Sequence, residues 1–301
     1  MRSNGKLLLT GEYFVLDGAL ALACPTRFGQ EFTFHQASQA QAFSWHAFDH
    51  QGEQWLEAQF DQQGYLQTST DNAAGQLLEK IFQYFARLKP GFWEKQTLAS
   101  VVSHLDFPRL WGLGSSSTLI AALAQWAGVD AFELLDATLG GSGYDIACAQ
   151  TNSPILYQRR QNRAAYVELP YAPAFADHLL FVYLGKKQDS RTGIGHYRQM
   201  GLEKDEWINK ISYLTIRFLQ SQTAAQLAEV MALHEDYISE ALQLPKVKDL
   251  YFPDFEGAVK SLGAWGGDFI LACSPLPSSV VKTYFQEKGF ETILTFDELF
   301  F

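Results

Sequence analysis

The chain has 301 residues, of which 47% are hydrophobic and 14% aromatic, and its formal net charge is −10 at pH 7. This length and apolar content can bury one large core or two medium ones, and we expect two domains. The acidic balance argues against a nucleic-acid partner, because duplex binding depends on basic patches that release counterions. The apolar run after Lys6 is too short to span a bilayer and follows no cleavable signal. We therefore expect a cytoplasmic protein without a membrane partner.

Partial alternation of apolar and polar residues predicts extended segments in the N-terminal part of the chain. These segments cover residues 6–10, 19–23, 28–35, 41–48 and 54–59. An amphipathic helix is predicted over 73–88, because Leu77, Ile81 and Phe85 fall on one helical face. The sequence therefore predicts an N-terminal antiparallel sheet with a helix packed on it.

In the middle of the chain, predicted strands alternate with predicted helices. A strand is predicted over 97–105 and helices over 115–127 and 130–138. A hairpin follows at Pro154–Gln158 and Ala165–Leu169, and residues 171–174 are the best candidate for a linker.

Beyond this linker, the nearly continuous apolar run over 178–184 is typical of a buried strand. Helical patterns are predicted at 205–220, 223–241, 254–262 and 277–288, and strands at 268–272 and 291–296. This mixture is typical of an α+β protein.

The three cysteines are predicted to be small buried residues. Cys24, Cys148 and Cys273 are widely spaced and fit no zinc or redox spacing. We therefore expect them neither to hold a metal nor to form a redox pair.

A glycine-rich run precedes the helix predicted at 115–127 and consists of Gly112, Leu113, Gly114, Ser115, Ser116 and Ser117. Two glycines let the backbone turn with its N–H groups exposed, and the following helix adds the positive end of its dipole. Such a turn can hold an anion, and its hydroxyls can bond phosphate or Mg²⁺. The alternative is a structural turn with a serine cap. The run has neither the Gly-Lys-Ser/Thr ending of a Walker A loop nor three glycines in dinucleotide spacing.

Residues 108–117, which include this run, resemble the central motif P-x-x-x-G-L-G-S-S-A of the GHMP kinases, with Ser117 in place of alanine. Residues 4–18 look like the family's first motif, P-G-K-x-x-L-x-G-E-H-x-V-x-x-G, and 260–268 like a degraded third motif, K-x-x-G-A-G-G-G-G. Residues 141–147 are similar to the S-G-x-D segment of mevalonate-type members. The resemblance thus covers nearly the whole chain in the right order.

The resemblance implies an α+β fold of two domains, the GHMP kinase fold. A ribosomal-S5-like N-terminal domain would cover residues 1–172, a ferredoxin-like C-terminal domain would cover 173–301, and the active site would lie between them. It also implies an ATP- and Mg²⁺-dependent kinase for a small-molecule alcohol, of which mevalonate or a related isoprenoid precursor is the leading candidate. Phosphomevalonate, homoserine or a sugar are alternative acceptors, and a non-catalytic ligand-binding protein is the alternative of another class. A homodimer is left open.

Two residues are expected to carry the chemistry. Asp145 would accept the proton of the acceptor hydroxyl. The alternative is that it caps a helix beginning at Ile146. Lys6 would keep that carboxylate ionised and stabilise charge on the transferring phosphoryl group, whereas outside the motif it is a solvated lysine at a strand edge.

Three residues are expected at the acceptor. Glu12 would lie by the substrate or order its loop, or else be a surface carboxylate. Tyr13 replaces the family's histidine, which contacts substrate, so the identity of the acceptor stays open. Arg191, in the basic segment 186–192, could bind a phosphate or an acidic group in bidentate fashion, or belong to a solvated charge cluster.

For Mg²⁺, the resemblance implies Ser116 together with a glutamate about eleven residues before the catalytic aspartate. That position holds Leu134, so the neighbouring Glu133 is the candidate and Asp136 the alternative; Glu133 could also be a plain exposed helix residue. Trp265 and Asp268 replace glycines of the third motif, and an aspartate beside a triphosphate would repel it unless it points away or binds metal.

Overall fold

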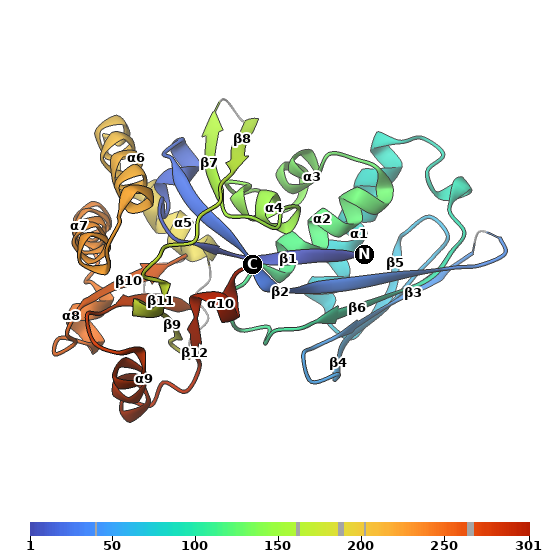
Figure 1. Ribbon diagram of the computed structural model, residues 1–301. Helices are drawn as coiled ribbons and strands as arrows, with labels where there is room; N and C mark the ends of the chain where they lie inside the picture. The colour runs from blue at the N-terminus through green and yellow to red at the C-terminus, as the bar shows by residue number, and fades with distance from the viewer. Residues whose placement is uncertain (40, 161–162, 186–189, 202, 264–267) are drawn as a thin grey trace. The chain divides into compact units, whose positions relative to one another are not determined.

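A computed structural model describes residues 1–39, 41–160, 163–185, 190–201, 203–263 and 268–301, and of Ser190 and Arg191 only the backbone. The chain forms two compact units (Figure 1). Unit 1 consists of residues 1–5, 28–109 and 113–150, and unit 2 of residues 6–27, 110–112 and 151–301. The predicted domain boundary between residues 172 and 173 is a different division of the chain and stays a prediction.

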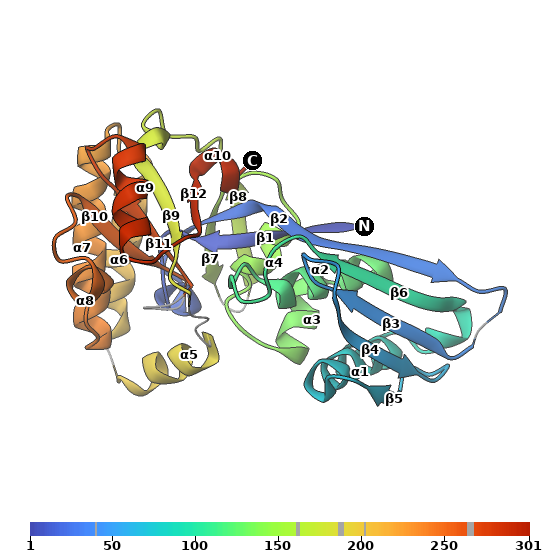
Figure 2. The same cartoon turned by 90° about the horizontal axis from the view of Figure 1, so that it is seen from below.

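Unit 1 is a sheet covered by helices on one face (Figure 2). Its strands follow the order β5 (Leu66–Ser69), β4 (Gln54–Phe60), β3 (Phe43–Phe48), β6 (Leu98–Leu105) and the second half of β2 (Ala21–Gln36). The pairing of β3 with β6 is parallel, so the antiparallel sheet expected from the sequence is wrong at this pair, where the chain crosses over through β4, β5 and α1 between the two strands. The other pairings are antiparallel. The helices are α1 (Asn72–Leu88), α2 (Ser115–Ala127), α3 (Ala131–Thr138) and α4 (Tyr144–Ala149), and a short turn, η2, covers Trp93–Lys95.

The core of unit 1 is rich in aromatic rings. Phe82 of α1 packs edge-on against Phe43 and Phe60 of the sheet, with ring centroids 5.4 and 5.0 Å apart. Helix α1 begins after Asp71, whose side chain accepts a hydrogen bond from the Ala74 N–H. Ile81 and Phe85 are buried and Leu77 packs against the core, so the buried face predicted from the sequence is confirmed.

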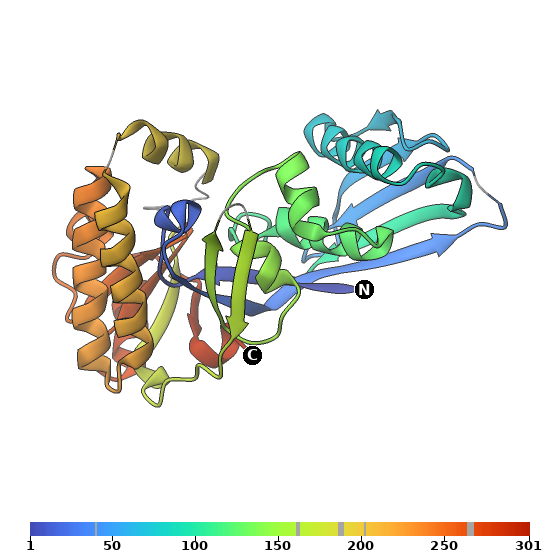
Figure 3. The same cartoon turned by 90° about the horizontal axis from the view of Figure 1, so that it is seen from above.

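Unit 2 contains a second, antiparallel sheet. Its strands follow the order β10 (Ala258–Leu262), β11 (Phe269–Cys273), β9 (Leu179–Tyr183) and β12 (Ile293–Thr295). Its helices are α5 (Ser190–Gln199), α6 (Lys204–Gln220), α7 (Ala224–Leu242), α8 (Val247–Tyr251), α9 (Ser278–Glu287) and α10 (Phe296–Leu299). Helices α6 and α7 pack side by side (Figure 3), and α7 lies along the edge strand β10.

The first half of β2 also belongs to unit 2, where it pairs with β7 (Ile155–Arg160), and β7 pairs with β8 (Arg163–Glu168). Strand β1 (Arg2–Leu8) pairs with β2. The turn after β1 leads into η1 (Phe14–Asp17), and η3 (Ala176–His178) precedes β9. The α+β class expected from the sequence is therefore observed.

One predicted element is wrong. Residues 254–262 were expected to be helical, because Phe255, Val259 and Leu262 have helical spacing, but 258–262 form β10. All five residues of this strand are buried, so the alternation that marks a half-buried strand is missing. The segments predicted at 19–23 and 28–35 are parts of one long strand, β2, and β5, α5, α8 and α10 were not predicted.

Two further expectations can be compared with the described residues. Cys24, Cys148 and Cys273 are all buried, as expected. Within the described ranges, none of the helices combines the length and the apolar character needed to cross a bilayer.

Candidate functional site

The glycine-rich run lies directly before α2 and has the backbone geometry that the sequence predicts. Gly112 and Gly114 have φ of 68° and 92°, in the left-handed region that glycine adopts without strain. The side chain of Leu113 between them is fully buried and anchors the turn in the core. Helix α2 begins at Ser115, so its N-terminus directly follows the glycine turn.

Among the described residues, no side chain caps the N-terminus of α2. Gly114 occupies the N-cap position and offers no side chain, and the first helical hydrogen bond runs from the Thr118 N–H to the Gly114 carbonyl. In the part of the chain that the structure describes, no acceptor bonds the N–H groups of Ser115, Ser116 and Ser117. The Ser117 hydroxyl donates a hydrogen bond to the Gly114 carbonyl at 2.8 Å, while the Ser116 side chain is exposed. Three open N–H groups and a free-standing hydroxyl are suited to an anion.

The start of the glycine run is held by two charged residues of unit 2. Lys6, on β1, donates from Nζ to the Gly112 carbonyl at 2.9 Å. A Cβ on Gly112 would overlap the carboxylate of Asp268, which is 8% exposed. Glycine is therefore required at 112 because the Asp268 side chain packs directly on this backbone. Trp265 lies outside the described residues.

Asp145 is in the first turn of α4, which packs against α2 and α3 within unit 1. Its Oδ1 accepts from the Ile146 N–H at 3.1 Å, and the side chain is half-buried. The helix starts at Tyr144 with Gly143 as its N-cap, so Asp145 is not the cap itself. Lys6 is in unit 2, and its pairing with Asp145 stays a prediction.

Glu12 is fully buried, so its interpretation as a surface carboxylate is wrong. Its Oε1 forms an ion pair with Nζ of Lys260, on β10, and its Oε2 lies 3.3 Å from Nε2 of His234, on α7. Burial raises the pKa of Glu12 against the opposing effect of the Lys260 ammonium. Burial also holds the pKa of His234 well below its ordinary value, so this imidazole is neutral. We call Glu12, His234, Glu235 and Lys260 the buried ionic cluster.

Tyr13 is 9% exposed and has an unusual backbone, with φ of 59°. Its ring lies 5.8 Å from that of Tyr197 on α5. A Cβ on Gly193, also on α5, would meet the Tyr13 hydroxyl, so glycine permits this close approach. Arg191 falls in the first turn of α5 but its side chain is outside the described structure, as are residues 186–189.

The magnesium ligands expected from the resemblance lie on different helices of unit 1. Ser116 is at the start of α2, and Glu133 is exposed in the first turn of α3. Burial and the negative charge of Glu133 together raise the pKa of Tyr84, on α1. Asp136 is exposed one turn further along α3. Among the described residues no group of three or more His, Cys, Asp and Glu side chains is arranged to hold a metal. The pairing of Ser116 with Glu133 stays a prediction.

Sequence reasoning missed the partners of Glu12. Lys260 was recognised as the first residue of a degraded motif but received no role, and His234 and Glu235 received none. Lys260 is a charged residue between the apolar residues Val259 and Leu262 on a fully buried strand. A lysine in such a run indicates a buried carboxylate partner, because an unpaired buried ammonium is costly.

No family model matches the sequence, and no curated protein matches it. Solved structures match over nearly the whole chain. The phosphomevalonate kinase of Streptococcus pneumoniae, in complex with phosphomevalonate and AMPPNP, is 18% identical with a TM-score of 0.68, covering 98% of this chain and 99% of its own. The mevalonate kinase of Methanococcus jannaschii is 13% identical with a TM-score of 0.65, covering 98% and 96%.

A sugar kinase is similar to the same extent. The galactokinase of Lactococcus lactis, complexed with galactose, is 10% identical with a TM-score of 0.65 and covers 98% of this chain and 92% of its own. Identities this low establish the fold and leave the acceptor open. The chain has the two-domain fold of the GHMP kinases.

Proposed function

We propose that the protein is a kinase that transfers the γ-phosphoryl group of MgATP to the hydroxyl of a small molecule. The observation that carries this proposal is the uncapped N-terminus of α2 behind two left-handed glycines, in a chain with the fold of small-molecule kinases. Three unused backbone N–H groups at a helix start bind phosphate oxygens without any positively charged side chain. One structure of this fold was solved with the ATP analogue AMPPNP, which supports a nucleotide as the ligand.

In this proposal, residues 112–117 hold the triphosphate. The N–H groups of Ser115, Ser116 and Ser117 face its oxygens, and Lys6 steadies the loop through the Gly112 carbonyl. Mg²⁺ takes few protein ligands and keeps several waters, so the Ser116 hydroxyl and one carboxylate, which we assign to Glu133, would suffice beside the phosphates. Bound Mg²⁺ would neutralise charge on the phosphates.

Asp145 is the proposed base. The acceptor oxygen bonds to the γ-phosphorus, the bond from that phosphorus to the β,γ-bridging oxygen breaks, and ADP departs with the electron pair. The hydroxyl proton passes to the Asp145 carboxylate, which stands on the helix that packs against α2. Lys6 is assigned to stabilise the negative charge of the transferring group.

Mevalonate is the acceptor we propose, with Glu12, Tyr13 and Arg191 assigned to its site. The motif pattern supports this choice, since Gly11-Glu12-Tyr13 matches the mevalonate-type motif in two of three positions. Because Glu12 is fully enclosed, we assign it to ordering the loop that presents Tyr13. Phosphomevalonate, homoserine and sugars remain alternatives. We also propose a cytoplasmic location.

The test is ADP release by the purified protein with MgATP and each candidate acceptor in turn. We expect turnover with mevalonate that depends on the acceptor and exceeds the ATPase background. Turnover only with phosphomevalonate, homoserine or a sugar would overturn the mevalonate assignment and keep the kinase. Tight MgATP binding without turnover on any acceptor would favour the non-catalytic class.

A further inference from the structure

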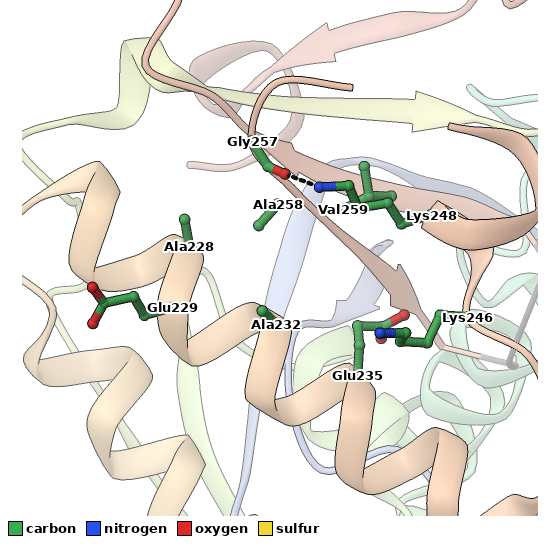
Figure 4. A pocket seen from close by; sticks show the side chains of 9 residues that line it. All are labelled: Ala228, Glu229, Ala232, Glu235, Lys246, Lys248, Gly257, Ala258 and Val259. Atoms are coloured by element: carbon green, nitrogen blue, oxygen red, sulfur yellow. Dashed lines mark hydrogen bonds between the residues drawn. The ribbon is translucent and has the colours of Figure 1, made fainter. Parts of the chain in front are cut away.

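A hollow of about 300 Å³ lies in unit 2 between α7 and the edge strand β10, apart from the glycine loop. Ala228, Ala232 and Glu235 line it from one stripe of α7, across from Gly257, Ala258 and Val259 (Figure 4). The hollow exists because the facing positions carry small residues. Lys246 and Lys248 enter from the side of α8, and Glu229 points away from the other labelled residues.

The carboxyl group of Glu235 lines the hollow from a buried position. Its side chain is 2% exposed, and in the described structure its Oε1 has no hydrogen-bond partner. The Ser261 hydroxyl donates to the other oxygen, Oε2, at 3.4 Å. A buried polar atom without a partner is destabilising, so this oxygen is suited to a ligand atom.

Lys248, which is half-buried, provides a second polar group at the hollow. Its Nζ donates to the Gly257 carbonyl at 2.5 Å (Figure 4), and among the described residues no carboxylate lies within ion-pair distance of it. An ammonium has three donors, so two remain for a ligand. Lys246 differs, because it is already paired with Asp236 at 2.8 Å and Asp249 at 3.6 Å.

The charge of the hollow favours an anion over a cation. Burial raises the pKa of Glu235 to about 8, with Lys260 opposing the rise and Glu12 adding to it, so at neutral pH this carboxyl is mostly a neutral donor. A neutral acid and a lysine both donate to a carboxylate oxygen, and the methyl groups of three alanines suit an apolar body. A phosphate dianion would lose more hydration in such surroundings.

We propose that this hollow is a second small-molecule site, which binds a compact carboxylate with a short apolar tail. Its carboxylate accepts from the Lys248 ammonium and the Glu235 carboxyl, and its tail lies against Ala228, Ala232 and Ala258. None of its residues belongs to the glycine loop, and Glu235 is the residue that it shares with the buried ionic cluster around Glu12.

The test compares three probes with the same four-carbon body: butyrate, butan-1-ol and butylamine. Their binding is followed by NMR of the protein labelled at alanine methyl groups, since three alanines line the hollow. We expect butyrate to shift the signals of Ala228, Ala232 and Ala258 saturably, butan-1-ol to bind more weakly and butylamine not to bind. Equal shifts from all three probes, or no saturable shift from butyrate, would overturn the proposal.

Variants locate the binding. Lys248→Met should weaken butyrate about tenfold or more, the usual cost of one charge-assisted hydrogen bond. Lys80→Met is the matched control, since Lys80 also donates to a backbone carbonyl, that of Thr138, but far along the chain in unit 1. Glu235→Gln keeps a donor that cannot ionise, so butyrate affinity should fall above pH 8 in the wild type but not in this variant. Unchanged affinity in Lys248→Met would contradict the site.

Discussion

The start of α2 and the turn after β1 both match family motifs, yet they differ in how their polar groups are satisfied. At the start of α2, the N–H groups of residues 115–117 bond nothing in the described chain, and Ser116 is exposed. After β1, Glu12 is fully buried and paired with Lys260. One region is left open for a ligand, whereas the other is enclosed and held by an ion pair within the protein. A match to a motif therefore identifies a position in the fold, and the satisfaction of its polar groups indicates whether it binds or supports.

The largest effect is expected on the stability of the protein, at the ion pair between Glu12 and Lys260. Lys260→Met removes the partner of Glu12 and leaves a buried carboxylate uncompensated, which typically costs about 3–5 kcal/mol of unfolding free energy. Denaturant unfolding measures it. Lys204→Met is the control, because Lys204 pairs with Asp17 at 2.9 Å in a partly exposed position where about 0–1 kcal/mol is expected. If both variants lose the same small amount, the cluster does not support the turn.

A change at Asp145, on the helix that packs against α2, should lower activity without loss of stability. Asp145→Asn is expected to lower turnover about 10²-fold or more, because the amide cannot accept the hydroxyl proton, while ATP affinity stays nearly unchanged. Initial rates and nucleotide titration separate the two quantities. Full turnover in the folded variant would remove Asp145 from the mechanism.

The buried ionic cluster also predicts a pH dependence of stability. The pKa of Glu235 rises from 4.5 in the unfolded chain to about 8 in the folded one. Between these values the folded state holds a proton that the unfolded state has lost, so stability falls as pH rises through this window. Lys260 opposes the shift and Glu12 adds to it.

Glu235→Gln cannot ionise and should lack this slope. Melting temperatures from pH 5.5 to 8.5 should show the wild type falling relative to the variant, with the difference growing toward the alkaline end. Parallel curves would mean that Glu235 titrates in the folded state as it does in the unfolded chain.

The smallest effect concerns magnesium. Glu133→Gln should raise the Mg²⁺ concentration needed for half-maximal activity, while Asp136→Asn should not, because Mg²⁺ needs only one carboxylate beside Ser116 and the phosphates. Titrating Mg²⁺ at fixed ATP measures this. The reverse pattern would give the role to Asp136, and no effect from either would leave Mg²⁺ to Ser116, the nucleotide and water.

Local signals explain which parts of the fold were predictable. Helix α2 was predicted with its observed bounds, 115–127, and in the structure left-handed glycines stand at both of its ends, Gly114 and Gly128. Strand β10 was not, since complete burial removes alternation and its apolar residues have helical spacing by coincidence. Helix α5 was not, because Gly193 and Gly195 weaken the helical signal.

The candidate site follows the same division. The glycine run is contiguous, so its chemistry could be predicted from its own residues. The burial of Glu12 could not, because its partner Lys260 is 248 residues away in sequence and meets it only in the folded chain. The contact between Asp268 and Gly112 could not be predicted either, because it forms only in the folded chain. Each of the two residues is nevertheless visible in its own motif.

The central claim is that the open start of α2 binds a triphosphate, and calorimetry with MgAMPPNP tests it most directly. Wild-type protein should bind, and so should Asp145→Asn. In Gly114→Val, the added side chain strains a left-handed backbone and enters the space where phosphate approaches, so affinity should fall about tenfold or more in protein that circular dichroism shows to be folded. Unchanged affinity in folded Gly114→Val would contradict the account and reduce the glycine run to a structural turn.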